Sequence, residues 1–109
     1  MTTAELEARV RDEAGSAVIV LTGDLDRDAE AALDAAYSQV RHAPSVVLDF
    51  AGVPYINSTG IAVIVGLLAR ARHNGQTLGA RGLNEHYRQI FEITRLADFM
   101  TILDEKGTE

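Results

Sequence analysis

The spacing of apolar residues changes several times along this chain, from every second position to every third or fourth. Residues 5–12 alternate between apolar and charged side chains, which predicts a β-strand with one face toward water. After the turn signal Gly15-Ser16, residues 17–22 form an apolar and largely β-branched run, which predicts a second, more buried strand. Because the connection is short, the two strands are expected to form an antiparallel hairpin.

A first helix is predicted between residues 29 and 40, where apolar side chains recur at a spacing of three and four positions. Asp26 lies just before this stripe and is suited to cap the helix, because its carboxylate can accept free backbone amide protons. Pro44 is expected to prevent the helix from continuing. The apolar run at residues 45–50 then predicts a strand that is covered on both faces.

The second half of the chain shows the same change of spacing. Residues 53–60 are expected to form a loop, and residues 61 to about 73 are expected to form a helix. Residues 77–81 predict a short strand, after which Asn84 can cap a third helix. The apolar stripe of this third helix consists of Tyr87, Ile90, Phe91 and Thr94.

With residues 99–103 as a last strand or an apolar tail, the predicted order of elements is β-β-α-β-α-β-α-β. Strands that alternate with single helices favour a mainly parallel sheet with right-handed crossovers, and the opening hairpin makes the sheet mixed. No internal repeat or long linker interrupts this order. The sequence therefore predicts a single α/β domain over residues 1–109, with helices packed on a mixed, mostly parallel sheet.

The balance of charge argues against nucleic acid and membranes as partners. Lys and Arg number 10 and Asp and Glu number 16, so the net charge is −6, and no basic stripe offsets it. The longest apolar stretch, residues 61–69, is far shorter than the roughly 20 residues of a membrane span. The N-terminal residues lack the basic and apolar blocks of a signal peptide, and the chain has no cysteine. We therefore expect a cytoplasmic protein that binds no nucleic acid and inserts into no membrane.

Motifs that would indicate catalysis are absent from the sequence. There is no phosphate-binding glycine loop and no G-x-S-x-G nucleophile elbow. Asp24, Asp26 and Asp49 lie near predicted strand ends, where ligands bind in open α/β sheets, but capping and loop hydrogen bonds are the favoured interpretation. The histidines are interpreted as surface residues or helix-end charges: His42, His73 and His86. The sequence thus predicts a non-enzymatic protein with no catalytic residue, cofactor or metal site.

The helix that begins near Ser58 has an unusual outer side. Its core face is predicted to consist of Ile61, Ile64, Leu67, Leu68 and Ala71. The opposite side begins with small residues instead of long charged ones, and it consists of Ala62, Gly66, Ala69, Arg70 and His73. A glycine inside a helix costs about 1 kcal/mol relative to alanine, so a close contact at Gly66 is expected to compensate. That contact is either with another part of this domain or with a partner protein.

Ser58 itself has two interpretations. Asn57, Ser58 and Thr59 are all residue types that favour the N-cap of a helix, and the physics of capping favours Ser58 as a cap. The alternative is a hydroxyl exposed at the helix N-terminus, where backbone amides and the helix dipole would tolerate a phosphate.

Three parts of the chain resemble the signatures of a known family. Residues 20–26 (VLTGDLD) resemble the LTGELD signature of bacterial STAS domains. Residues 47–50 (VLDF), followed by residues 55–61 (YINSTGI), are similar to the family's LDL…φDSSGL motif, in which φ is apolar. Residues 90–96 (IFEITRL) are similar to the LFEITGL segment of the third helix. The likeness spans nearly the whole chain in the same order, and it implies a STAS fold of the anti-sigma factor antagonist type.

The resemblance implies a partner-switching role in transcription regulation and the stress response. In the family, the unphosphorylated domain binds an anti-sigma factor that is also a serine kinase of the histidine-kinase-like ATPase type, and the sigma factor is released. The kinase phosphorylates the serine that matches Ser58, the complex dissociates, and a serine phosphatase resets it. Thr59 is an alternative acceptor. The residues expected to bind the partner are Asp24, Asp26, Asn57, Ser58, Thr59, Gly60, Ala62, Gly66, Ala69 and Arg70.

Two positions depart from the family pattern. Asn57 replaces the usual aspartate before the serine, which removes a charge from the place where a kinase would read its substrate. Arg95 stands where glycine is common, which predicts a different closure of the third helix.

Two other functions stay open at this point. The chain is alternatively a constitutive STAS subunit of a larger assembly, such as a stress-sensing complex or the accessory subunit of a lipid-transport ATPase. A third alternative is a small-ligand or nucleotide-binding module that uses Asp24 and Asp26 at the end of the sheet.

Overall fold

Strands and helices follow one another in the predicted order. The structure, a computed structural model, describes residues 5–103. Its strands are β1 (Glu7–Glu13), β2 (Ser16–Thr22), β3 (Ser45–Gly52), β4 (Thr77–Arg81) and β5 (Thr101–Ile102). Its helices are α1 (Glu30–Ser38), α2 (Ser58–His73) and α3 (Glu85–Ile93), with a short 3-10 helix before α1 (Arg27–Ala29) and another after α3 (Leu96–Asp98).

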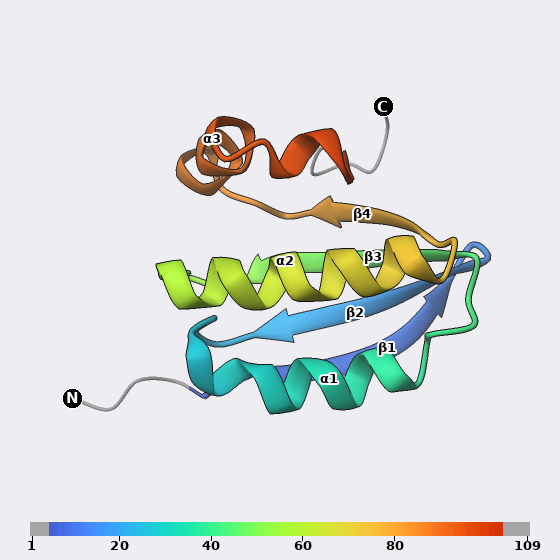
Figure 1. The fold of residues 1–109 in the computed structure, drawn as a ribbon. Helices are drawn as coiled ribbons and strands as arrows, with labels where there is room; N and C mark the ends of the chain where they lie inside the picture. Colours follow the sequence, from blue (N-terminus) through green and yellow to red (C-terminus); the bar gives the residue numbers. More distant parts are fainter. Residues whose placement is uncertain (1–4, 104–109) are drawn as a thin grey trace.

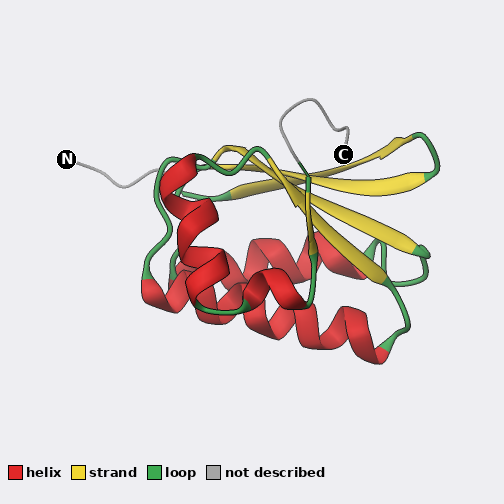
Figure 2. Cartoon of the chain, turned by 90° about the horizontal axis from the view of Figure 1, so that it is seen from above, coloured by secondary structure: helices red, strands yellow, loops and turns green. Residues whose placement is uncertain are grey.

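The strands form one sheet in the order β1-β2-β3-β4-β5. β1 is antiparallel to β2, whereas every later pair of neighbours is parallel. α1 and α2 lie side by side across one face of this sheet (Figure 1), and the helices of the described residues all lie on that face (Figure 2). The predicted α/β fold with a mixed, mostly parallel sheet is therefore confirmed.

The prediction that both faces of residues 45–50 are covered is wrong. Val46, Leu48 and Phe50 are buried toward the helices, whereas Val47 and Asp49 are half-buried on the other side, called the helix-free face below. On that face Val47 stands between Val18 of β2 and Gly79 of β4, and no helix of the described residues covers it (Figure 2). The apolar run at residues 45–50 therefore has one face buried under the helices and one face that is only half-buried.

The β1–β2 hairpin turns one residue earlier than predicted. Glu13 pairs with Ser16, so the two central residues of the turn are Ala14 and Gly15. Ser16 is already the first residue of β2. Both central residues have positive φ, 51° for Ala14 and 87° for Gly15. This geometry matches the right-handed twist of the strands, which is why two-residue hairpin turns adopt it. Ala14 adopts it at a cost of about 1–2 kcal/mol, which a glycine would avoid.

A cluster of ion pairs links three strands on the helix-free face. The Arg81 guanidinium donates to both carboxylate oxygens of Glu13, at 2.9 and 3.1 Å, and its Nε donates to Asp49 at 3.1 Å. Arg11 adds a second cation 2.7 Å from Glu13. The hydrogen bond from Arg81 holds the pKa of the Glu13 carboxyl below its usual range, and the hydrogen bond to Glu13 raises the pKa of Arg81.

This cluster predicts a specific dependence of stability on pH. Because the pKa of Glu13 is lowered by folding, the ion pair stabilises the domain fully above the unfolded-state pKa, about 4.3. The contribution is lost as the pH falls through the lower folded-state pKa. We therefore expect Glu13→Gln to be less stable than the wild type at about pH 7, and the difference to vanish at about pH 2.

Urea unfolding at several pH values measures this difference directly. Glu7→Gln is the matched control, because Glu7 is exposed on the same strand and forms no ion pair with the described residues. A Glu13→Gln variant whose pH profile matched that of Glu7→Gln would show that the cluster does not stabilise the fold.

α1 begins as predicted and ends earlier than predicted. Asp26 caps the 3-10 helix before α1, because its Oδ1 accepts the amide of Asp28 at 3.0 Å. The helix ends at Ser38, well before Pro44. Between them the chain makes tighter turns, for example from the Ala43 amide to the Val40 carbonyl at 2.9 Å, so Pro44 is not what stops the helix.

α3 is closed at its end by a residue in the left-handed conformation. Asn84 caps the start as predicted, with its Oδ1 accepting the Tyr87 amide at 2.9 Å. Thr94 is the exposed C-cap rather than part of the buried stripe. Arg95 follows with φ of 69°, a conformation that glycine adopts freely and that costs other residues about 1–2 kcal/mol. α3 therefore ends in the left-handed conformation that glycine would favour, although the residue is an arginine.

Candidate functional site

Two connections meet at the N-terminal end of α2. One runs from β2 to α1 and contains Leu25, and the other runs from β3 to α2 and contains Ile56. Leu25 and Ile56 form a single parallel bridge, in which the Leu25 amide donates to the Tyr55 carbonyl at 2.9 Å. The Asn57 amide donates to the Leu25 carbonyl at 3.2 Å. This bridge brings the segment of Asp24 and Asp26 beside the segment of Asn57 and Ser58, which lie far apart in the sequence.

Asn57, and not Ser58, caps α2. Its backbone is extended, with φ of −98° and ψ of −178°, and its Oδ1 accepts the Gly60 amide at 2.8 Å. Ser58 is already the first residue of the helix, so its side chain cannot fold back over the free amides as a cap does. The prediction that Ser58 is the cap is therefore wrong.

The two hydroxyl groups after Asn57 differ in their bonding. Thr59 donates its hydroxyl proton to Asn57 Oδ1 at 2.8 Å, so it is part of the cap. Ser58 is exposed, and its hydroxyl makes no hydrogen bond with any described residue. Ser58 is thus the free hydroxyl of this segment, and Thr59 is tied to the backbone geometry of the helix start.

Gly60 lies beneath this surface and is buried. A Cβ atom placed there would lie 1.9 Å from the Leu25 carbonyl oxygen, far inside any permitted contact. Only glycine allows the first turn of α2 to approach the β2–α1 connection so closely. Gly60, one of the predicted partner-binding residues, is thus buried in the described structure, beneath the exposed Ser58 and Thr59.

The outer side of α2 is open in the described structure. Ala62, Gly66 and Ala69 are all exposed, and a Cβ atom at Gly66 would meet nothing within 4 Å. The predicted core face is buried at Ile64, Leu67, Leu68 and Ala71, with Ile61 half-buried. No described part of this domain therefore compensates the cost of a glycine within the helix.

A shallow groove separates this open side of α2 from α1. The groove is lined by Glu30, Leu33, Asp34, Ala62, Val63, Gly66, Leu67 and Arg70. Arg70 spans it, with its guanidinium 2.5 Å from the Asp34 carboxylate and stacked 5.0 Å above the centre of the Tyr37 ring. Both members of the ion pair are about half exposed, so it is open to water.

The acidic residues near the sheet end have mostly structural roles. Asp26 caps the 3-10 helix, and Asp49 accepts the Ala51 amide at 2.9 Å as well as the Arg81 guanidinium. Asp24 is half-buried and forms no ion pair with a described residue. Within residues 5–103, no group of three or more acidic or histidine side chains is placed to hold a metal ion. His42, His73 and His86 are exposed, as predicted.

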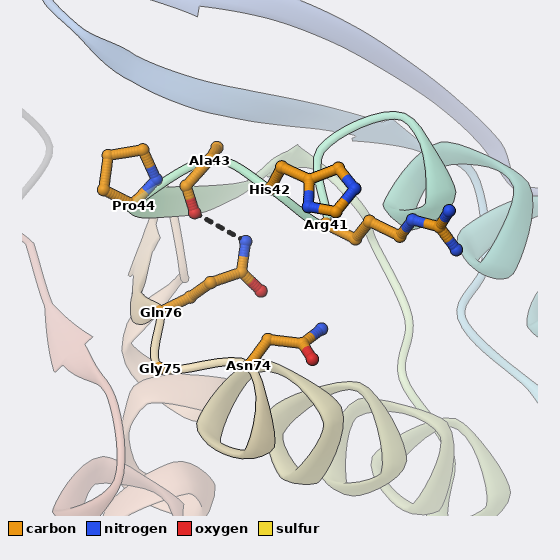
Figure 3. Close-up of a pocket in the computed structure, with 7 residues that line it drawn as sticks. All are labelled: Arg41, His42, Ala43, Pro44, Asn74, Gly75 and Gln76. Carbon is orange, nitrogen blue, oxygen red and sulfur yellow. Dashed lines mark hydrogen bonds between the residues drawn. The ribbon is translucent and has the colours of Figure 1, made fainter.

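A pocket lies at the opposite end of α2, and its buried polar side chain, Gln76, is already hydrogen-bonded within the domain. Figure 3 shows Gln76 pointing into it, with its Nε2 donating to the Ala43 carbonyl at 2.7 Å and also to the Val40 carbonyl at 2.8 Å. The Oε1 of Gln76 accepts the Tyr37 hydroxyl proton at 2.5 Å. The amide group of this buried side chain is therefore fully used in joining α1 to β4, and the pocket offers no free buried polar group.

No helix in the described part of the chain is both long and apolar enough to pass through a membrane.

Comparison with known proteins gives a family match and several relatives. The family model described as "Mlab, STAS domain" matches residues 8–104. The anti-sigma-B factor antagonist of Staphylococcus epidermidis is 36% identical over 64 residues, which are 59% of this chain and 57% of that protein. The matched part therefore spans less than two thirds of that relative.

Solved structures share the fold at low sequence identity. An anti-sigma factor antagonist from Mycobacterium paratuberculosis is 22% identical, with a TM-score of 0.72 over 90% of this chain and 85% of that one. The Bacillus cell fate determinant SpoIIAA in its phosphorylated form is 17% identical, with a TM-score of 0.67 over 91% of this chain and 93% of that one. At these identities the likeness shows the fold alone.

Proposed function

This chain belongs to the STAS domain family, and we propose that it is an anti-sigma factor antagonist whose binding to its partner is switched off by phosphorylation of Ser58. The observation that carries the proposal is the free, exposed hydroxyl of Ser58 beside the open, small-residue side of α2. The names of its relatives support the same assignment.

The partner in this proposal is a protein and not a small molecule. It is an anti-sigma factor that is also a serine kinase of the histidine-kinase-like ATPase type, and a serine phosphatase removes the phosphate again. The domain itself has no catalytic role and acts in the cytoplasm by occupying the anti-sigma factor. The contact surface is formed by Asp24, Asp26, Asn57, Ser58, Thr59, Ala62, Gly66, Ala69 and Arg70, with Gly60 beneath it.

Phosphorylation at Ser58 changes the charge of this surface without opposing the fold. A phosphate adds about 1.5 to 2 negative charges at pH 7, and the positive end of the α2 dipole favours them. The same charges must lose their water when a partner covers the helix start, and the half-buried carboxylates of Asp24 and Asp26 are already nearby. Each 1.4 kcal/mol lost from the interface weakens binding about tenfold, so a local change is sufficient for a switch.

The bonding of the two hydroxyls favours Ser58 over Thr59 as the acceptor. A kinase must place the acceptor oxygen in line with the transferred phosphoryl group, which requires a hydroxyl that can leave its existing contacts. Thr59 would give up its bond to Asn57 Oδ1, whereas Ser58 gives up none within the described structure.

The test is phosphate transfer from a purified candidate kinase, an anti-sigma factor of this ATPase type from the same genome, supplied with ATP and magnesium. We expect the intact mass of the domain to rise by one phosphate. Ser58→Ala is expected to abolish the gain and Thr59→Ala to retain it, because of these two hydroxyls only that of Ser58 makes no hydrogen bond with a described residue. Transfer to Thr59, or to neither residue, would contradict the proposed switch.

A constitutive STAS subunit of a larger assembly is the second candidate, and Asn57 favours it. The residue caps α2 through a neutral amide, so a negative charge is missing immediately before the serine. This candidate predicts a stable complex in which no phosphate is transferred from ATP to the domain. The stability of that complex would not depend on phosphorylation.

A further inference from the structure

The connection between β3 and α2 is held in place by α3. Two buried aromatic residues of α3 contact this part of the chain, one at the end of β3 and the other within the connection. The ring of Phe91 packs edge-on against Phe50, the last buried residue of β3, with the ring centres 5.8 Å apart. One turn earlier, the hydroxyl of Tyr87 accepts the amide proton of Ile56 at 2.9 Å. Helix α3 therefore contacts the segment that leads directly to Ser58.

The hydrogen bond from Ile56 to Tyr87 satisfies a donor that has no other partner in the described structure. Ile56 is 6% exposed and Tyr87 is 7% exposed, so little water reaches the amide. The neighbouring backbone groups bond elsewhere, since the Tyr55 carbonyl accepts from Leu25 and the Asn57 amide donates to the Leu25 carbonyl. A buried amide without an acceptor is disfavoured, so loss of the Tyr87 oxygen is expected to displace the backbone around Ile56.

Ile56 immediately precedes the residue that caps α2. Asn57 sets the first turn of the helix through its bonds to Gly60 and Thr59, and Ser58 lies within that turn. A shift at Ile56 is therefore transmitted to Ser58 through covalently adjacent residues.

We propose that Tyr87, on α3, is a positioning residue for Ser58, on α2. Its hydroxyl holds the Ile56 amide in place, and this sets the position of Ser58 two residues later. The inference rests on the proposed function, because it concerns the presentation of Ser58 to a kinase. It assigns α3 a role in the switch in addition to packing at the sheet.

Tyr87→Phe tests this, because it removes the hydroxyl oxygen and keeps the ring with its edge contact to His86. Tyr37→Phe is the matched control. Tyr37 is also buried, at 3% exposed, and its hydroxyl bonds Gln76 and Asn74, but it lies at the opposite end of α2. Comparison of the two variants separates a local effect on the β3–α2 connection from the general loss of a buried tyrosine hydroxyl.

The first readout is amide hydrogen exchange of the isolated domain, followed by NMR under native conditions. We expect the Ile56 amide to exchange at least about tenfold faster in Tyr87→Phe than in Tyr37→Phe, after correction for global stability. Amides in the middle of β3 and α2 are expected to be equal in the two variants. Equal exchange at Ile56 would overturn the proposal.

The second readout is the kcat/KM of phosphate transfer to Ser58 by the kinase described above. Tyr87→Phe is expected to lower it about tenfold relative to Tyr37→Phe, mainly through kcat, because the misplaced hydroxyl affects the transfer step. Faster exchange at Ile56 without a change in this rate would refute the effect on Ser58. A wild-type domain that takes no phosphate would instead overturn the proposed function, and the exchange experiment would still decide whether Tyr87 fixes Ile56.

Discussion

Replacing Gly60 with alanine is expected to destabilise the domain by about 3 kcal/mol or more. The added methyl group would lie 1.9 Å from the Leu25 carbonyl oxygen, and that oxygen already accepts the Asn57 amide. The obstacle is backbone and not a flexible side chain, so α2 and the β2–α1 connection must move apart. That movement breaks the bridge between Leu25 and Ile56, which holds the two halves of the candidate site together.

Gly66→Ala is the matched control in the same helix. Its methyl group would meet nothing within 4 Å, so the substitution removes the cost of a glycine within a helix and creates no clash. We expect it to stabilise the domain by about 1 kcal/mol. Urea unfolding should therefore show a lower free energy of unfolding for Gly60→Ala and a higher one for Gly66→Ala than for the wild type. If α2 were simply sensitive to any substitution, both values would fall.

A small loss of stability in Gly60→Ala would mean that the β2–α1 connection moves away easily. The close approach at Leu25 would then not be what defines the start of α2, and the geometry assigned to Ser58 would lose its support. The sign of the Gly66→Ala effect is equally informative. Destabilisation there would indicate a contact at Gly66 within this chain, and the open side of α2 would no longer be available to a partner.

The periodicity of the sequence was sufficient for the order of strands and helices, because burial on one face imposes the same spacing wherever an element lies. Asn84 was predicted as a cap for a local reason, since it precedes an apolar stripe with no other capping residue type beside it. Asp26, which has Asp24 and Asp28 nearby, caps the 3-10 helix ahead of α1. Ser58 was predicted as the cap of α2 in place of Asn57, because the two are adjacent and both residue types cap helices. Only the backbone conformation decides which of them folds back over the free amides.

The remaining differences depend on contacts between distant parts of the chain. Nothing in the spacing of residues 45–50 indicates that helices cover only one face of β3, because coverage is decided by the other elements. The bond between Tyr87 and Ile56 joins residues that are 31 positions apart, and the sequence presents Tyr87 as an ordinary core residue. Gly60 was recognised as part of a motif, but its close approach to Leu25 has no signal in spacing or composition.

Ser58→Asp is expected to weaken binding to the anti-sigma factor at least about 100-fold, a loss of about 2.7 kcal/mol, while the domain melts at or above the wild-type temperature. The carboxylate would stand in the first turn of α2, where a negative charge typically stabilises a helix by about 0.3–1 kcal/mol. Ser58 makes no hydrogen bond with a described residue, so its replacement removes no contact of the fold. The loss of binding arises because the new charge must be buried by the partner without a compensating group.

Calorimetric titration with the anti-sigma factor and thermal unfolding of the free domain measure these two effects separately. Ser58→Ala is the control, since it removes the hydroxyl without adding charge and is expected to bind as the wild type does. Wild-type affinity in Ser58→Asp would place the interface elsewhere on the domain. A lowered melting temperature would show that Ser58 supports the helix start after all, and the loss of binding would then follow from unfolding. The combination of intact stability and lost binding is what distinguishes a charge switch on an open surface from damage to the fold.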